Sequence, residues 1–279
     1  MEEIQTIKRL SKLGICGIIS LLFYTAMVVF SPLAYPGYNW MSMAVSELSA
    51  VGAPSKELAG QLNALFGPCA LVSVMAVCIA VAGSKSKLFR IGIYLFALME
   101  WCCNVGYECF PWVSDENALA FQNIMHIAVT VAVVVLSIVS LLVIAIGAKK
   151  DNRKTIEVWA IISLAAMLGG AIGTHILPQM LFGIAERIST FSVVVFNAVL
   201  GIELLRGSLN DNQHEKNNGK KVRKNYPVLN GDRDTANVLV TLPDDIQRDI
   251  IDKAGANMKA FEHVNYCLAV RKGEKYAKN

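Results

Sequence analysis

Six long apolar runs constrain this chain more than any other feature. A helix needs about twenty predominantly apolar residues to cross roughly 30 Å of hydrocarbon, and six stretches meet that requirement. They lie at approximately 13–31, 62–82, 88–110, 121–147, 156–177 and 181–205. Of the whole chain, 54% is hydrophobic and only 17% is charged, which excludes an ordinary soluble domain. The sequence therefore predicts an integral membrane protein, an all-α polytopic bundle of six transmembrane helices.

Positive charges in the connections between these runs indicate how the chain is oriented. The connections at 83–87 and 148–155 hold six lysines and arginines, whereas those at 32–61 and 111–120 hold a single one, Lys56. Short loops rich in lysine and arginine stay on the cytoplasmic side of a membrane. We therefore expect a multi-pass protein of the cell membrane with both termini in the cytoplasm.

The chain divides into a membrane domain, residues 1–206, and a polar tail. Residues 207–235 are rich in asparagine, lysine and glycine, which predicts a flexible basic linker. Residues 236–279 predict a small cytoplasmic α/β appendage, a short strand followed by a helix with Pro243 in its first turn and Gly255 as its stop. This order faintly resembles a ribbon-helix-helix DNA-binding unit, but the strand lacks the polar face that such a unit needs. Docking to a cytoplasmic protein partner is therefore favoured over nucleic-acid binding.

Polar side chains recur at helical spacing in three of the six spans. The stretch LMEWCCNVGYECFPW, at 98–112, places Glu100 inside an otherwise apolar run, and residues four apart lie on one face of a helix. The repeating positions are Glu100, Asn104 and Glu108 in the third span, Gln122, His126 and Thr130 in the fourth, and Glu186, Thr190, Asn197 and Gly201 in the sixth. These stripes lie mostly in the outer halves of their spans.

A cavity that opens outward would account for these stripes. An ionisable side chain in hydrocarbon usually faces the bundle interior or water and pairs with another polar group. We therefore expect Glu100 to face a cavity shared with His126, Glu186, Arg187 and, at the outer end of the fifth span, His175. In the alternative interpretation Glu186 and Arg187 only anchor the sixth span at the interface, and the asparagines and threonines only join helices by hydrogen bonds.

The long outer connection, residues 33–60, contains proline, glycine, tyrosine and tryptophan. Aromatic rings are favoured at the membrane interface, so this composition predicts a loop with a short helix lying there. Ser46, Glu47 and Ser49 form a compact polar group within it. A solvated loop without a binding role is the alternative.

Two patterns near the ends of spans concern packing and solvation. In LGGAIGTH, at 168–175, Gly169 and Gly173 are four residues apart, which favours close helix packing. Glu157 and Glu203 lie near the cytoplasmic ends of their spans, where we expect ordinary solvated charges.

Four motifs in a fixed order resemble a known family. They are SELSAVGAP at 46–54, GYECFPWVSDE at 106–116, His126 at the start of the fourth span, and GIAERIS at 183–189. Over roughly residues 10–206 the chain resembles prokaryotic six-span membrane proteins catalogued as domain of unknown function 998 (DUF998). The resemblance implies that the characteristic positions are Ser46, Pro111, Asp115, His126, Glu186 and Arg187. It implies the architecture and no particular activity.

Binding or transport of a small or amphipathic ligand is the function that the polar stripes favour, with Glu100 and His126 as proton-sensitive groups and no cofactor. The residues expected to line the cavity or contact the ligand are Ser46, Glu100, Asn104, Asp115, His126, His175, Glu186 and Arg187. A second alternative is a membrane sensor or scaffold that signals through the tail, in which case deletion of 207–279 would abolish its effect.

A membrane-embedded hydrolase acting on lipid is the enzymatic alternative. Membrane hydrolases of the ceramidase and adiponectin-receptor type need a serine, an aspartate and three histidines around zinc. The membrane part of this chain has only His126 and His175, so a third ligand would have to be Asp115, Glu100 or Glu108. Zinc is expected only under this alternative, and the sequence leaves open whether the protein is an enzyme.

Overall fold

The structure is a computed structural model that describes residues 9–113 and 120–209, all within one compact unit, Met1–His214. Its long helices are α2 (Ile15–Phe30), α4 (Phe66–Val81), α5 (Lys87–Cys109), α6 (Ala120–Lys150), α7 (Lys154–Ile176) and α8 (Phe182–Leu205). The short ones are α3 (Lys56–Asn63) and the 3-10 turns η1 (Ser31–Ala34), η2 (Ser46–Ser49) and η3 (Gln179–Leu181). Asp115 and the predicted strand and helix of the tail lie outside the described residues.

Six helical stretches are long and apolar enough to cross a membrane, which confirms the predicted spans. The first runs through Arg9–Ala34, the second combines α3 and α4, and the boundaries of the others agree with the prediction to within a few residues. Within the outer connection lie the 3-10 turns η1 and η2, and α3 begins there at Lys56 and continues into the second span, so a short helix lying at the interface stays a prediction. The protein is therefore a multi-pass membrane protein with an all-α bundle.

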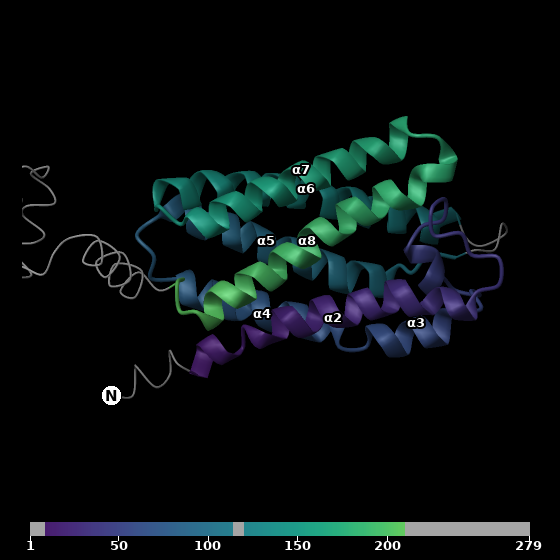
Figure 1. The fold of residues 1–279 in the computed structure, drawn as a ribbon, viewed down its shortest axis with the longest axis horizontal. Coiled ribbons are helices and arrows are strands. Elements are labelled where there is room, and N and C mark those ends of the chain that lie inside the picture. Colours follow the sequence, from purple (N-terminus) through teal and green to yellow (C-terminus); the bar gives the residue numbers. More distant parts are fainter. Residues whose placement is uncertain (1–8, 114–119, 210–279) are drawn as a thin grey trace, which may run out of the picture. The chain divides into compact units, whose positions relative to one another are not determined.

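The long helices run lengthwise beside one another in Figure 1, and the contacts between neighbouring spans close into a ring. Neighbours in the ring are α2 and α4, α4 and α5, α5 and α6, α6 and α7, α7 and α8, and α8 and α2. Helix α8 contacts α4 in addition, and it is the most buried of the six. Polar side chains on α8 are therefore enclosed by several other helices at once.

The interior is apolar, with phenylalanines at its centre, and the outer surface is apolar too. The rings of Phe96 and Phe196 meet edge to face, with centroids 5.2 Å apart, and both side chains are fully buried. On the outside, large apolar side chains such as Leu22, Ile79 and Val131 are more than half exposed. A helix that is hydrophobic on all sides suits a bundle surrounded by lipid.

Glycine allows α7 and α8 to approach closely, as the small residues of the fifth span predict. A methyl group at Gly170 would lie 2.5 Å from the backbone nitrogen of Ser189 and 2.6 Å from the carbonyl oxygen of Ala185. At Gly173 it would lie 3.0 Å from the Ala185 side chain, whereas Gly169 faces open space. The prediction of close helix packing is therefore confirmed, but the residues at the contact are Gly170 and Gly173, whereas Gly169 takes no part in it.

The second span is interrupted between α3 and α4, which differs from the uninterrupted run predicted at 62–82. Helix α3 ends at Asn63 and α4 begins at Phe66, two residues before Pro68. Proline has no backbone N–H, so it cannot continue the hydrogen bonding of a helix that comes before it, but it is tolerated in a first turn. Because Ala64 and Leu65 keep right-handed helical dihedral angles, the interruption is a kink.

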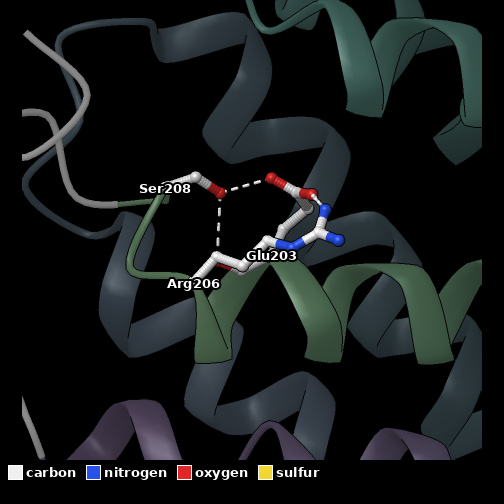
Figure 2. A network of polar contacts seen from close by, with 3 residues as sticks. All are labelled: Glu203, Arg206 and Ser208. Carbon is white, nitrogen blue, oxygen red and sulfur yellow. Dashed lines mark hydrogen bonds and ion pairs between the residues drawn. The ribbon is translucent and has the colours of Figure 1, made fainter. Parts of the chain in front are cut away.

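The end of α8 is closed by a compact network of polar contacts (Figure 2). Gly207 has a φ of 70°, its N–H donates to the Leu204 carbonyl, and the Ser208 N–H donates to the Glu203 carbonyl, the arrangement of a Schellman cap. The Glu203 carboxylate accepts hydrogen bonds from the Ser208 hydroxyl and, at 2.9 Å, from Arg206. Glu203 is only 6% exposed, so the expectation of a solvated charge is wrong for this residue.

Candidate functional site

Glu100 lies at the centre of a polar cluster between α4, α5 and α8, and it is 4% exposed. Its two carboxylate oxygens each accept a hydrogen bond from a carboxamide. Asn104, one turn along α5, donates to Oε2 at 3.2 Å, and Asn197 of α8 donates to Oε1 at 3.1 Å. Asn197 also donates to the carbonyl oxygen of Ala70 on α4 at 3.3 Å. The carboxyl group thus joins three helices.

The cluster around Glu100 contains no ion pair in the part of the chain that the structure describes. No described lysine, arginine or histidine lies within ion-pairing distance of the Glu100 carboxylate. Two buried oxygens of the neighbouring helices, Asn197 Oδ1 and Ser73 Oγ, accept and donate no hydrogen bond among residues 9–113 and 120–209. The cluster is therefore rich in oxygen atoms and contains one acidic group without a counter-charge.

Glu186 and Arg187, at the start of α8, contact the outer connection. The Glu186 carboxylate accepts a hydrogen bond of 2.7 Å from the Val45 backbone N–H. Arg187 donates to the carbonyl oxygens of Met43, at 3.0 Å, and Gly183, at 2.8 Å, and to the Tyr38 hydroxyl at 2.6 Å. These contacts fix residues 38–47, which we call the outer loop, against the end of α8.

Two further features tighten this contact. A methyl group at Gly183 would lie 2.5 Å from the carbonyl oxygens of both Trp40 and Met43, so only glycine fits. The Tyr38 hydroxyl donates to the Ala44 carbonyl at 2.8 Å. Burial raises the pKa of Tyr38 above its ordinary value, although the neighbouring Arg187 guanidinium opposes the rise, so the hydroxyl keeps the proton that it donates.

His126, near the start of α6, is buried against the segment that ends α5. Its Nδ1 lies 2.8 Å from the Phe110 carbonyl oxygen, and because a carbonyl can only accept, Nδ1 carries the proton. The imidazole packs on the rings of Tyr107 and Trp112, with centroids 5.0 and 5.5 Å away. Tyr107 in turn donates to Thr130 at 3.1 Å. The histidine therefore helps to fix the connection from α5 to α6.

The predicted cavity residues fall into separate groups with different contacts. Glu100 and Asn104 belong to the central cluster, Glu186 and Arg187 to the outer-loop contact, and His126 to the α5–α6 connection. Ser46 begins η2 and is half-buried, and its carbonyl accepts a bond of 3.5 Å from the Ser49 hydroxyl. His175 is exposed in the last turn of α7. No hydrogen bond or ion pair joins His126 or His175 to Glu100 among the described side chains, and a cavity shared by them stays a prediction.

Metal ligands were predicted at His126, His175 and Asp115. Within residues 9–113 and 120–209, no three side chains of histidine, cysteine, aspartate or glutamate are close enough to hold one metal ion. Asp115 lies outside the described ranges, so the zinc-dependent hydrolase stays a prediction.

Sequence reasoning missed the contribution of α4 to the central cluster. Ser73 and the Ala70 carbonyl lie in an apolar run with no polar periodicity, so no pattern marks them. The kink just before them does have a signal, because Gly67 and Pro68 interrupt the predicted span. A methyl group at Gly67 would lie 2.8 Å from Asn104 Oδ1, so the small residue lets α4 pass close to the cluster. Asn197 was part of the predicted stripe on the sixth span, but its partner could not be predicted.

Residues 18–203, two thirds of the chain, match a family model described as "Protein of unknown function (DUF998)". The matched range extends from α2 to the last turn of α8. It includes the central cluster, the outer loop and His126. A search of curated proteins and a search of solved structures found no match.

Proposed function

The chain belongs to the DUF998 family of six-span membrane proteins, and from this premise we propose that it binds or transports a small or amphipathic ligand through the Glu100 cluster. The observation that carries the proposal is a buried carboxyl group that has amide partners and, in the described part of the chain, no counter-charge. If both termini lie in the cytoplasm of a cell-membrane protein, as we propose, the end of α5 nearer to Glu100 lies on the outer side.

The cost of burying Glu100 supports a functional role. Placing a charged side chain at the centre of a membrane helix costs about 2.5–3.5 kcal/mol on insertion scales, and such residues commonly mark ligand or ion pathways. The Glu100 carboxylate accepts hydrogen bonds from two asparagine side chains, and each of these side chains also donates to a second acceptor. Asn197 also bonds the Ala70 carbonyl, and Asn104 also bonds the Glu100 backbone carbonyl at 2.9 Å. The bundle would therefore keep hydrogen bonds on both asparagines without the carboxylate, which argues against a purely structural function.

The position of Glu100 suits an approach from the side of the outer loop. Glu100 lies nine positions before Cys109, the last residue of α5. This corresponds to about 14 Å along the helix axis. The kink at Ala64 and Leu65 lies beside the same cluster, because Gly67 faces Asn104. Interrupted spans that place backbone and side-chain polar groups together near the bilayer midplane are typical of ligand sites in transporters. An amphipathic ligand could place its polar head group at Glu100 and its apolar part beside the kink.

A panel of amphipaths with one tail and different head groups tests the proposal. The full-length protein would be placed in lipid nanodiscs, and its thermal unfolding would be followed while decylamine, decanoate, decyl phosphate or decanol is titrated. We expect one head group to raise the unfolding temperature saturably, because a ligand that binds only the folded protein stabilises it. The same titration is then repeated with Glu100→Gln.

Glu108→Gln is the matched control, because Glu108 lies two turns further along α5 but is exposed. A response lost in Glu100→Gln and kept in Glu108→Gln supports the proposal. Responses that do not differ between head groups, or that both variants keep, would reject a ligand site at this cluster.

A further inference from the structure

We propose that the Glu100 cluster binds a small monovalent cation of the sodium type between α4, α5 and α8. The proposal rests on the proposed function in one respect, since it treats Glu100 as a ligand-binding group. It adds the chemical class of an ion that would accompany the ligand.

The Glu100 carboxylate has hydrogen-bonding capacity that its two partners do not use. An ionised glutamate has about four lone-pair positions on its two oxygens. Asn104 and Asn197 occupy one position on each oxygen. About two positions remain, one on each oxygen, in a place that solvent reaches poorly because Glu100 is 4% exposed. A cation would use these positions and balance the charge.

Two further buried oxygens, on α4 and α8, have no hydrogen-bond partner in the described part of the chain. Asn197 is 1% exposed and Ser73 is fully buried, and their Oδ1 and Oγ atoms make no hydrogen bond within the described ranges. A buried oxygen without a partner costs roughly 1–3 kcal/mol, so such atoms call for an explanation. Hard cations are held by carboxylate, amide and hydroxyl oxygens of this kind.

Asn197 and Ser73 lie close to each other, where α4 and α8 meet. The Asn197 carboxamide bonds both Glu100 and the Ala70 carbonyl, and Ser73 follows Ala70 by one turn on the same side of α4. A methyl group at Gly17 would lie 2.8 Å from Ser73 Oγ and 3.0 Å from the Asn197 backbone oxygen. One at Gly201, a turn after Asn197, would lie 3.2 Å from Ser73 Oγ. Ser73 therefore lies where α4 meets Gly17 of α2 and the Asn197–Gly201 turn of α8.

The charge of the cluster favours a monovalent ion. Glu100 is the acidic group among the residues that form it, and Glu108 on the same helix is exposed. Divalent cations in proteins are usually held by several carboxylates, and magnesium in addition keeps water molecules. A single carboxylate with neutral oxygens matches one positive charge.

Sodium titration of the full-length protein in nanodiscs of neutral lipid tests the proposal without any amphipath. Sodium chloride would replace choline chloride at constant ionic strength, and the thermal unfolding midpoint would be measured. We expect a saturable rise with sodium and none with choline, because only an ion that fits the site stabilises the folded state. Coinciding sodium and choline curves would overturn the proposal.

Ser73→Ala is the most informative variant, because it removes an oxygen that has no hydrogen-bond partner among residues 9–113 and 120–209, so the fold should stay intact. We expect the sodium concentration for half-saturation to rise by about tenfold or more. Ser137→Ala is the matched control, since this buried serine of α6 bonds the Val133 carbonyl of its own helix at 2.6 Å. Glu100→Gln should abolish the response. A wild-type sodium response in Ser73→Ala would overturn the proposed site.

The two proposals can fail separately. Head-group binding without any effect of sodium would reject the cation site and leave the ligand site. A sodium response without head-group discrimination would keep the cation site and reject the proposed ligand.

Discussion

Two glutamates of the same bundle, Glu186 and Glu100, are held in opposite ways. Glu186 accepts from a backbone N–H of the outer loop. Arg187 beside it donates to the Met43 carbonyl and the Tyr38 hydroxyl of the same loop and to the Gly183 carbonyl of its own helix. Glu100 has only carboxamide partners and no ion pair among the described residues. The first group joins a loop to a helix, whereas the second concentrates uncompensated polar atoms in the interior. An acidic residue in a membrane span is therefore a candidate site only when its contacts do not already account for it.

The difference predicts that removing Arg187 causes the largest loss of stability. Arg187→Ala leaves the Tyr38 hydroxyl without a donor and the Met43 carbonyl with only the long 3.5 Å bond from Tyr38, and it removes the positive charge next to Glu186. We expect the free energy of unfolding to fall by about 3 kcal/mol. Thermal unfolding, together with protease cleavage within the outer loop, would measure it. A variant as stable as the wild type, with the loop still protected, would show that these contacts do not hold the loop.

A methyl group at Gly183 should have the next largest effect. Gly183→Ala places a carbon 2.5 Å from two carbonyl oxygens of the outer loop, so the loop must move. Overpacking of this kind costs about 1–3 kcal/mol. The expected lower unfolding temperature can be compared with Gly169→Ala, which adds the same group in open space on α7. Equal losses in the two variants would contradict a tight contact at Gly183.

Neutralising Glu186 should cost less, because a carboxamide oxygen can still accept from Val45. A hydrogen bond to a charged acceptor is about twice as strong as one to a neutral acceptor. We therefore expect Glu186→Gln to lose about 1 kcal/mol of unfolding free energy in the same thermal measurement. If this variant instead lost the response to amphipaths while keeping its stability, Glu186 would belong with Glu100 in the ligand site.

The same substitution at Glu100 should have the smallest effect on stability. Glu100→Gln loses one favourable amide contact but also removes a buried charge, and both asparagines keep other acceptors. We expect the free energy of unfolding to stay within about 1 kcal/mol of the wild type. A loss as large as that of Arg187→Ala would make Glu100 a structural residue and would end the distinction between the two glutamates.

Much of the fold could be predicted, because hydrophobicity along the sequence records contact with lipid directly. The six spans follow from that pattern, and the spacing of Glu100 and Asn104 correctly places them on one face, where they bond. Which helices meet that face depends on how each span is rotated in the bundle, and an apolar helix such as α4 carries no periodic signal of its rotation. The pairing of Asn197 with Glu100 and Ala70 therefore could not be predicted.

The kink in the second span shows a second reason why parts of the structure could not be predicted from the sequence. Hydropathy averaged over a window treats Pro68 as one residue among about twenty. Its missing N–H, however, removes one particular backbone hydrogen bond, and that local effect interrupts the helix. Likewise, Glu203 lies in a position where composition predicts contact with water. The Schellman cap folds Ser208 back over it, and that local geometry buries the carboxylate.

The cap at the end of α8 also decides where the chain can be shortened. Leu209 is 1% exposed and packs into the main apolar core, and Arg153, itself buried before α7, donates to the Ser208 carbonyl at 2.6 Å. A truncation that starts at Gly207 would remove three residues that belong to the bundle, and the resulting defect would be mistaken for loss of a signalling tail. A stop codon after Leu209 keeps these contacts and separates the two effects.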